Sequence, residues 1–294
     1  MSIKKILITG ASGQLGSAIS MLCSQQRDRF EIINTAHTDL DITDFLKVQL
    51  YLGDHAPDYI VNCAAYTAVD KAESDQKRAF EINKDGARNV AKVSAALKIP
   101  IIHISTDFVF DGSSSTPLNE EDLCRPINVY GQSKYEGEKA VQAENTKHFI
   151  IRTSWLYSNF GSNFLKSISK LAKEKSSLNI VFDQIGTPTF ANDLAEAIVK
   201  IIDSNASDYG IYHYSNEGVA SWYDFAKELI ELQGIQCDVR PILTSQYPTP
   251  AKRPSYSVLN KAKIKSTFGI DIPYWKESLR KCIEEQSFSA SINQ

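Results

Sequence analysis

The stretch K4-K-I-L-I-T-G-A-S-G-Q-L-G16 decides the fold that we predict for this chain. A short apolar run leads directly into a loop that contains Gly10, Gly13 and Gly16, and a helical pattern follows. Such a strand–loop–helix turn needs glycine for tightness, for close approach to a pyrophosphate and for helix–strand contact. Free N–H groups at the helix start favour an anion there. The loop therefore predicts a dinucleotide site, although its G-x-x-G-x-x-G spacing differs from the commoner G-x-G-x-x-G.

Working outward from this loop, short apolar runs alternate with helical patterns through the first half of the chain. The expected strands lie at residues 3–9, 30–34, 58–63, 100–105 and 149–153. The expected helices lie at residues 14–24, 44–53, 76–98 and 128–143. This alternation predicts an α/β fold with a Rossmann-like, doubly wound parallel sheet. The strand runs are almost continuously apolar, as expected when helices cover both faces of a sheet.

The pattern changes after residue 152, where loops rich in Pro, Thr and Tyr join further helical segments. These helices are expected at residues 163–175, 192–203, 221–233 and 275–284. The segment Y247-P-T-P-A-K-R-P-S255 cannot be helical through its three prolines. We therefore predict that residues 1–155 form an NAD(P)-binding Rossmann domain and that residues 156–294 form mainly a smaller substrate-binding lobe.

The composition of the 294-residue chain is that of an ordinary globular enzyme, with 43% hydrophobic residues, 23% charged residues and a net charge of −3. The absence of a basic excess argues against nucleic acid or an anionic membrane as a partner. Five scattered cysteines without a C-x-x-C pair fit reduced thiols in a cytoplasmic protein. The five histidines show no metal-ligand spacing, so we predict no metal site. No apolar run approaches the ~18 residues of a membrane span.

Tyr130 and Lys134 lie four residues apart in N128-V-Y-G-Q-S-K134, and therefore on one face of the expected helix. A phenol has a pKa near ~10 and is a poor acid–base group at neutral pH. We expect the neighbouring ammonium to lower that pKa. Beside a nucleotide site, the pair predicts proton transfer coupled to hydride transfer at a carbonyl group. On an arbitrary helix the same pair would be an aromatic packing contact and a solvated lysine.

Thr106 follows the fourth expected strand in S105-T-D-F-V-F-D-G112. Ligands of open α/β sheets bind at the carboxyl ends of the strands, so its hydroxyl should face the cleft. We predict that Thr106 hydrogen-bonds the substrate carbonyl beside Tyr130. The alternative is a turn or helix cap formed by Ser105 or Asp107.

The preference between NADPH and NADH stays open at this stage. An acidic residue at the end of the second strand would bind the adenosine ribose and favour NADH, whereas an arginine would favour the 2′-phosphate of NADPH. The run I32-I-N-T-A-H-T-D-L-D41 has neither at the expected position. Asp41 and Ile42 come later and could flank the adenine. We therefore predict use of both NADPH and NADH.

Several segments together resemble the extended short-chain dehydrogenase/reductase family. They are the glycine loop, N62-C-A-A-Y-T67, the Thr106 segment and the Tyr130 segment. Further segments narrow the resemblance to the dTDP-4-dehydrorhamnose reductases of that family. The most specific of these are R152-T-S-W-L-Y157 and P250-A-K-R-P254. The resemblance extends over nearly the whole chain.

The resemblance implies roles for individual residues. Tyr130 would donate the proton, Lys134 would bind the nicotinamide ribose and tune Tyr130, and Thr106 would take the usual Ser/Thr place. The implied cofactor contacts are Gly13, Gln14 and Leu15 to the pyrophosphate, Asp41 and Ile42 to the adenosine, and Ala65, Tyr66 and Thr67 to the middle of the cofactor. The implied substrate contacts are Asp107 and Trp155, and Arg253 is a chemically suitable partner for the nucleotide diphosphate.

The implied reaction is reduction of the 4-keto group of dTDP-4-dehydro-β-L-rhamnose to dTDP-β-L-rhamnose. Two alternatives remain open: a reductase or epimerase of another sugar nucleotide, and a non-catalytic regulatory subunit of the type found with methionine adenosyltransferase. Some family members are dimers that share a magnesium ion through glutamates, one of them just after the glycine loop. Here that stretch is G16-S-A-I-S20, without a carboxylate. We therefore expect no metal-bridged dimer, while a homodimer of another kind stays open.

Overall fold

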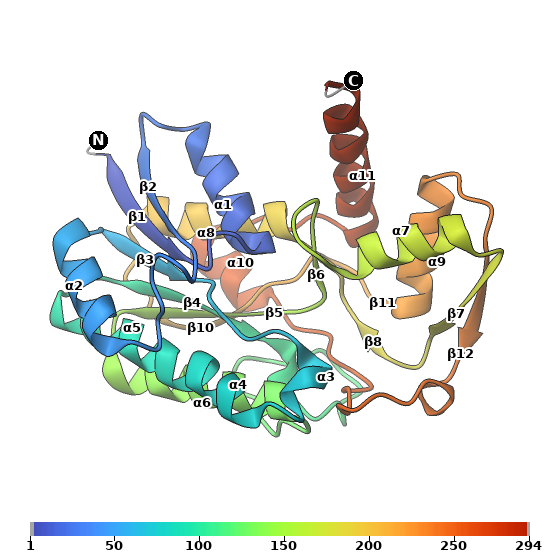
Figure 1. Cartoon of the computed structure of the whole chain (residues 1–294), viewed down its shortest axis with the longest axis horizontal. Helices are drawn as coiled ribbons and strands as arrows, with labels where there is room; N and C mark the ends of the chain where they lie inside the picture. Colours follow the sequence, from blue (N-terminus) through green and yellow to red (C-terminus); the bar gives the residue numbers. More distant parts are fainter. Residues whose placement is uncertain (1–2, 293–294) are drawn as a thin grey trace.

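Six parallel strands form the central sheet of the computed structural model, which describes residues 3–292 and the side chains of residues 3–286 (Figure 1). Their spatial order is β10-β5-β4-β3-β1-β2, and each neighbouring pair is parallel. The strands are β1 (Lys4–Thr9), β2 (Phe30–Thr35), β3 (Tyr59–Asn62), β4 (Ile101–Thr106), β5 (His148–Thr153) and β10 (Gly210–His213). The order reverses direction between β1 and β3, which opens a crevice at their carboxyl ends. The predicted doubly wound, Rossmann-like sheet is confirmed.

Helices cover both faces of this sheet (Figure 1). One face carries α1 (Gln14–Ser24), α8 (Ala191–Ser204) and α10 (Ala262–Phe268). The other face carries α2 (Phe45–His55), α5 (Ala87–Ala96) and α6 (Val129–Glu144). Successive side chains of β1 alternate between the two resulting cores: Ile6 and Ile8 pack in the first, and Leu7 packs in the second. The continuous apolar runs in the sequence follow from this double coverage.

A smaller lobe lies beside the sheet and has a hydrophobic core of its own. Its elements are α7 (Phe164–Glu174), β7 (Ser177–Val181), α9 (Trp222–Leu232), β12 (Asp238–Ile242) and α11 (Trp275–Ile292). The side chains of Asn163 and Ser221 cap the first turns of α7 and α9, which fixes where these helices begin. Two short strand pairs lie between the lobe and the sheet: β6 (Leu156–Tyr157) with β9 (Thr189–Phe190), and β8 (Ile185–Gly186) with β11 (Ala220–Ser221).

The chain passes more than once between the two parts. The helices α8 and α10 and the strand β10 come after residue 155, yet they complete the sheet layers. The division into residues 1–155 and 156–294 remains our proposal, and the second part contributes these three elements to the sheet. Among the described residues, no helix has both the length and the apolar character that a membrane crossing requires.

The helix predicted at residues 76–98 consists of three pieces. They are α4 (Gln76–Phe80), a π-helical turn η1 (Glu81–Gly86) and α5. In this turn the Asn83 side chain accepts a hydrogen bond from the Tyr66 backbone N–H and donates to the Ser133 hydroxyl, at 2.8 and 2.9 Å. Such turns frequently occur near functional sites. Hydrophobic periodicity did not reveal this turn, nor the short elements α3 (Val69–Ala72), α10 and β12.

Candidate active site

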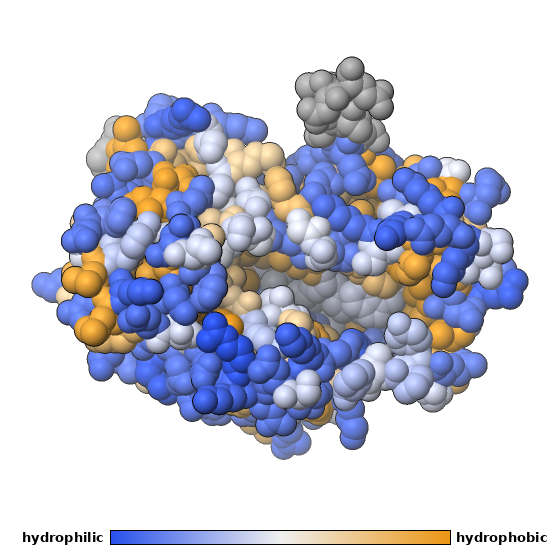
Figure 2. Space-filling model, in the orientation of Figure 1, coloured by the Kyte–Doolittle hydropathy of each residue, from blue (hydrophilic) through white to orange (hydrophobic). Residues whose placement is uncertain are grey.

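A cavity of about 830 Å³ opens at the carboxyl ends of β1, β3 and β4, between the sheet and the smaller lobe. Figure 2 shows the surface hollowed between these two parts. The position agrees with the rule that ligands of doubly wound sheets bind where the strand order reverses. In the described part of the chain, no three His, Cys, Asp or Glu side chains gather as a metal site would require.

The glycine loop forms one wall of the cavity and fits the pyrophosphate of a nicotinamide cofactor. A Cβ atom at Gly16 would lie 2.6 Å from the Cα atom of Ala11, so a side chain there would disturb the turn. Gly10 has a φ of +64°, and a Cβ atom on it would lie 2.8 Å from the backbone nitrogen of Ala64. The N-cap residue of α1 is Gly13, which has no side chain to cap the helix, and this leaves N–H groups for an anion.

The helix α6 carries Tyr130 and Lys134, and three contacts fix its start. The Asn128 side chain caps the helix by accepting a hydrogen bond from the Gly131 backbone N–H at 2.7 Å. The same side chain donates to the carbonyl oxygen of Lys252 at 2.7 Å. A Cβ atom at Gly131 would lie 2.2 Å from the carbonyl oxygen of Phe108, so only glycine permits this close approach. Asn128 thereby joins the helix to the segment that contains Arg253.

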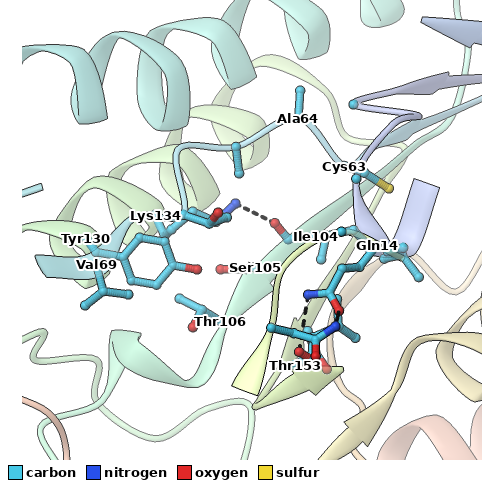
Figure 3. A pocket seen from close by; sticks show the side chains of 18 of the residues that line it. Gln14, Cys63, Ala64, Val69, Ile104, Ser105, Thr106, Tyr130, Lys134 and Thr153 are labelled. Atoms are coloured by element: carbon cyan, nitrogen blue, oxygen red, sulfur yellow. Dashed lines mark hydrogen bonds between the residues drawn. The ribbon is translucent and has the colours of Figure 1, made fainter. Parts of the chain in front are cut away.

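Tyr130, Lys134 and Thr106 gather at the end of β4 (Figure 3). The Tyr130 hydroxyl lies close to Ser105 and Thr106, and the Thr106 hydroxyl acts to lower the pKa of the phenol. The Lys134 ammonium donates to the carbonyl oxygen of Ile104 at 2.5 Å. The Thr106 hydroxyl also donates to the Asp107 carboxylate at 3.0 Å. Thr106, Asp107 and Lys134 are buried, whereas the Tyr130 ring is open in part to the cavity.

Burial controls the acid–base properties of this group. It raises the pKa of Tyr130 to about 12, and the hydrogen bond with Thr106 offsets only part of that shift. Burial lowers the pKa of Lys134 to about 8, although the carboxylate of Glu138 acts in the opposite direction. The predicted lowering of the Tyr130 pKa by Lys134 is therefore wrong for this conformation. Desolvation is the largest cause, the charge of Asp107 also raises the pKa of the phenol, and the ammonium of Lys134 donates to Ile104.

A buried ion pair contacts Ser105, the residue before Thr106. The side chains of Arg152 and Glu138 are 2% and 1% exposed, and Nη2 lies 2.8 Å from Oε2. The Ser105 hydroxyl donates a short hydrogen bond to the same carboxylate. A second bond from Arg152 Nε to Glu138 Oε1 makes the contact bidentate. The pair ties β4, β5 and α6 together, and each of its two buried charges is compensated by the other.

Aromatic rings form one wall of the cavity, on the side of the smaller lobe. Trp155 stacks on Trp222 with 3.6 Å between ring centroids and 7° between planes, and Phe164 packs against Trp222. Trp155 has a φ of +47°, a conformation that a bulky side chain rarely adopts. Gly186 makes room for the indole, because a Cβ atom there would lie 2.8 Å from it. One face of the Trp155 ring is thus already covered by a second tryptophan.

Arg253 also lines the cavity and is held by Asp70 of α3. The guanidinium forms a bidentate pair with the carboxylate, at 3.0 and 2.7 Å. Hydrogen bonds to Thr249 and to the Ala251 carbonyl oxygen hold the same group. The guanidinium is therefore fixed in orientation before a ligand arrives.

The structure brings nearly all of the predicted site residues to one cavity. Tyr66 is the exception, since its hydroxyl donates to Asp75 and its side chain does not line the cavity. The predicted residues that line the cavity are Gly10, Gly13, Gln14, Leu15, Gly16, Asp41, Ile42, Ala65, Thr67, Thr106, Asp107, Tyr130, Lys134, Trp155 and Arg253. The sequence did not predict His37, Arg78, Asn163, Phe164 or Trp222 as lining residues, since no spacing rule links them to the site.

Comparison with known proteins agrees with this geometry. The family model of the RmlD substrate binding domain matches residues 4–288. A dTDP-4-dehydrorhamnose reductase from Sinorhizobium fredii is 44% identical over 288 residues, which cover 95% of this chain and 96% of that protein. A dTDP-4-dehydrorhamnose reductase from Clostridium acetobutylicum superposes with a TM-score of 0.92 at 43% identity, covering 96% of this chain and 99% of that one.

A further structure, the dTDP-4-dehydrorhamnose reductase of Bacillus anthracis in complex with NADP, superposes with a TM-score of 0.93 at 38% identity. The alignment covers 97% of this chain and all of that one. The resemblance noted in the sequence is thereby confirmed. Since the family model and these relatives match over almost the full length, this chain belongs to the RmlD family of dTDP-4-dehydrorhamnose reductases.

Proposed function

We propose that this chain reduces the 4-keto group of dTDP-4-dehydro-β-L-rhamnose to dTDP-β-L-rhamnose with NADPH or NADH, as a step of dTDP-L-rhamnose biosynthesis. One observation carries the proposal: Thr106, Tyr130 and Lys134 face the same cavity as the glycine loop. Membership of the family supplies the substrate, and the glycine loop, Tyr130 and Trp155 line the same cavity of about 830 Å³.

The reduced nicotinamide supplies a hydride to the carbonyl carbon when it is bound in this cavity. Tyr130 serves as the proton donor. With a pKa of about 12 the phenol is protonated at neutral pH, and it is still more acidic than the alcohol that forms. Thr106 hydrogen-bonds the carbonyl oxygen and stabilises the charge that develops there. Lys134, charged below its pKa of about 8, stabilises the phenolate left behind by proton transfer.

The substrate is positioned from two sides. Trp155, with Trp222 behind it, provides an apolar surface for the deoxysugar. Arg253 provides a planar fork for the diphosphate, and Asp107 offers a polar contact next to Thr106. Binding energy from the nucleotide end then places the keto group beside Tyr130.

The test is an assay of NADPH and NADH oxidation with several keto-sugar nucleotides. We expect turnover with the dTDP-4-keto-deoxysugar and much slower turnover with compounds that carry another base or sugar. Turnover only with another compound would identify a related reductase or epimerase. Cofactor binding without turnover of any compound would support a regulatory subunit of the type found with methionine adenosyltransferase.

A further inference from the structure

Arg78 is a basic residue that lines the cavity and that the sequence did not predict there. It comes from α4, whereas His37 and Asp41 come from the loop after β2, and all three line the cavity. In doubly wound folds the residues after the second strand face the adenosine ribose of a bound dinucleotide. The structure therefore adds an arginine to this end, where the sequence showed none.

The Arg78 guanidinium keeps donor groups for an anion although it has an acidic neighbour. Within the described residues it forms one ion pair, in which Nη1 donates to Glu81 at 3.3 Å, and 36% of its side chain is exposed. Its charge also acts on Asp41: burial raises the pKa of that carboxyl, but hydrogen bonds from Thr43 and the charges of His37 and Arg78 lower it overall. The Nδ1 atom of His37 lies 3.9 Å from Asp41.

The one nearby acid is poorly placed to select NADH. The Asp41 carboxylate accepts hydrogen bonds from the Thr43 backbone N–H and hydroxyl, at 2.9 and 2.7 Å. The strand β2 itself ends at Thr35, without an acidic residue to bind the ribose 2′-hydroxyl. What distinguishes NADPH from NADH is a 2′-phosphate, and the planar fork of an arginine suits a phosphate.

We infer that Arg78, flanked by His37, recognises the 2′-phosphate of the adenosine ribose and gives this chain a preference for NADPH over NADH. The inference rests on the proposed function, which requires a nicotinamide dinucleotide in this cavity. In this inference the arginine comes from α4, while the end of β2 has none, as the sequence already showed.

The inference can be tested by binding measurements, which do not require turnover of a substrate. Calorimetric titration gives the dissociation constants of NADP⁺ and NAD⁺, and of the fragments adenosine 2′,5′-bisphosphate and 5′-AMP. In Arg78→Gln the preference for the 2′-phosphorylated member of each pair should fall roughly 10- to 150-fold, as for one charge-assisted contact. Added salt should weaken the preference in the unmodified protein.

Lys77→Gln is the matched control. Lys77 is 91% exposed, approaches the same Glu81 carboxylate at 3.8 Å and does not line the cavity. Its replacement should leave both preferences unchanged. Arg78→Lys keeps the charge but loses the planar fork, so its preference for the 2′-phosphorylated ligands should be intermediate. This variant also tests the inference if Arg78→Gln does not fold.

Three outcomes would overturn the inference: equal losses for both members of each pair, an unchanged preference in both Arg78 variants, or the same loss in Lys77→Gln. Failure of the unmodified protein to bind either dinucleotide would instead overturn the proposed function. The two failures are therefore distinguishable in one set of titrations.

Discussion

Tyr130 and Lys134 show how burial prepares two residues for proton transfer. Burial shifts the pKa of the phenol up to about 12 and that of the ammonium down to about 8. Both shifts favour the neutral form, because a charge loses hydration inside the protein. A protonated phenol is the form that a reduction needs, since Tyr130 has to give a proton away.

Replacement of Tyr130 by Phe should lower turnover by about 10²–10⁴, the usual effect of losing a general acid. The ring keeps its edge-on contact with Phe108, so the fold and the affinity for NADPH should be retained. Steady-state kinetics and cofactor titration of the purified variant measure both quantities. Turnover close to that of the unmodified enzyme would contradict the role of Tyr130.

The pH dependence of kcat/KM should report Lys134. The ammonium is charged below its pKa of about 8 and neutral above it, so kcat/KM should fall as the pH rises through about 8. In Lys134→Met the plateau should be lower and this fall should disappear. A fall at the same pH in the variant would show that another group titrates there.

At the scale of elements, short strands hold the aromatic wall in place. The pair β8–β11 places Gly186 directly against Trp155, and the first residue of α9 supplies Trp222. Trp155 thus depends on three elements that come later in the chain. Its left-handed backbone conformation persists because these contacts fix it from several sides.

Gly186→Ala should disturb this wall without changing any aromatic residue. The new methyl group would lie 2.8 Å from the indole, so Trp155 has to move and its stack with Trp222 weakens. An aromatic pair is worth about 0.5–1.5 kcal/mol, so KM for the sugar nucleotide should rise roughly 2- to 12-fold. The affinity for NADPH should be unchanged, which separates a substrate contact from general damage.

Gly53→Ala is a suitable control for that measurement. Gly53 lies within α2, and a Cβ atom there meets no other atom within 4 Å. The substitution should stabilise the helix by about 0.5–1 kcal/mol and leave KM unaltered. If KM changes equally in both variants, the Gly186 contact does not act through Trp155.

At the scale of the whole molecule, the segment that contains Arg253 connects the C-terminal part of the chain to the helices around the active site. Asn128 binds the carbonyl oxygen of Lys252, and Asp70 binds Arg253 and the Ala251 backbone N–H. The side chains of Arg253 and Asp70 are 24% and 41% exposed. An ion pair this open to solvent contributes only about 0–1 kcal/mol to stability.

Arg253→Gln should therefore change the free energy of unfolding by less than about 1 kcal/mol and yet raise KM for the sugar nucleotide roughly 10- to 150-fold. The larger effect would come from the lost contact with the diphosphate. Asp70→Asn removes the same ion pair but keeps the guanidinium, so its KM should rise less. Equal KM values in the two variants would mean that the ion pair matters and that Arg253 does not contact the substrate. Denaturant unfolding and steady-state kinetics measure the two quantities.

The sequence alone determined the fold class, the glycine loop and the Thr106, Tyr130 and Lys134 group. Each depends on local rules: the alternation of strands and helices, the glycine requirement of one turn, and the four-residue spacing of a helix face. Because parallel strands place their carboxyl ends along one edge, these local rules also predict which segments meet.

Only the tertiary structure decided the rest. It placed Arg78 beside Asp41 and Trp222 upon Trp155, and it joined Arg253 to Asp70. It also reversed the predicted pKa shift of Tyr130, because desolvation depends on every atom packed around the phenol. Residues that meet only after the chain has folded leave no period or spacing in the sequence, and burial is a property of the whole packed molecule.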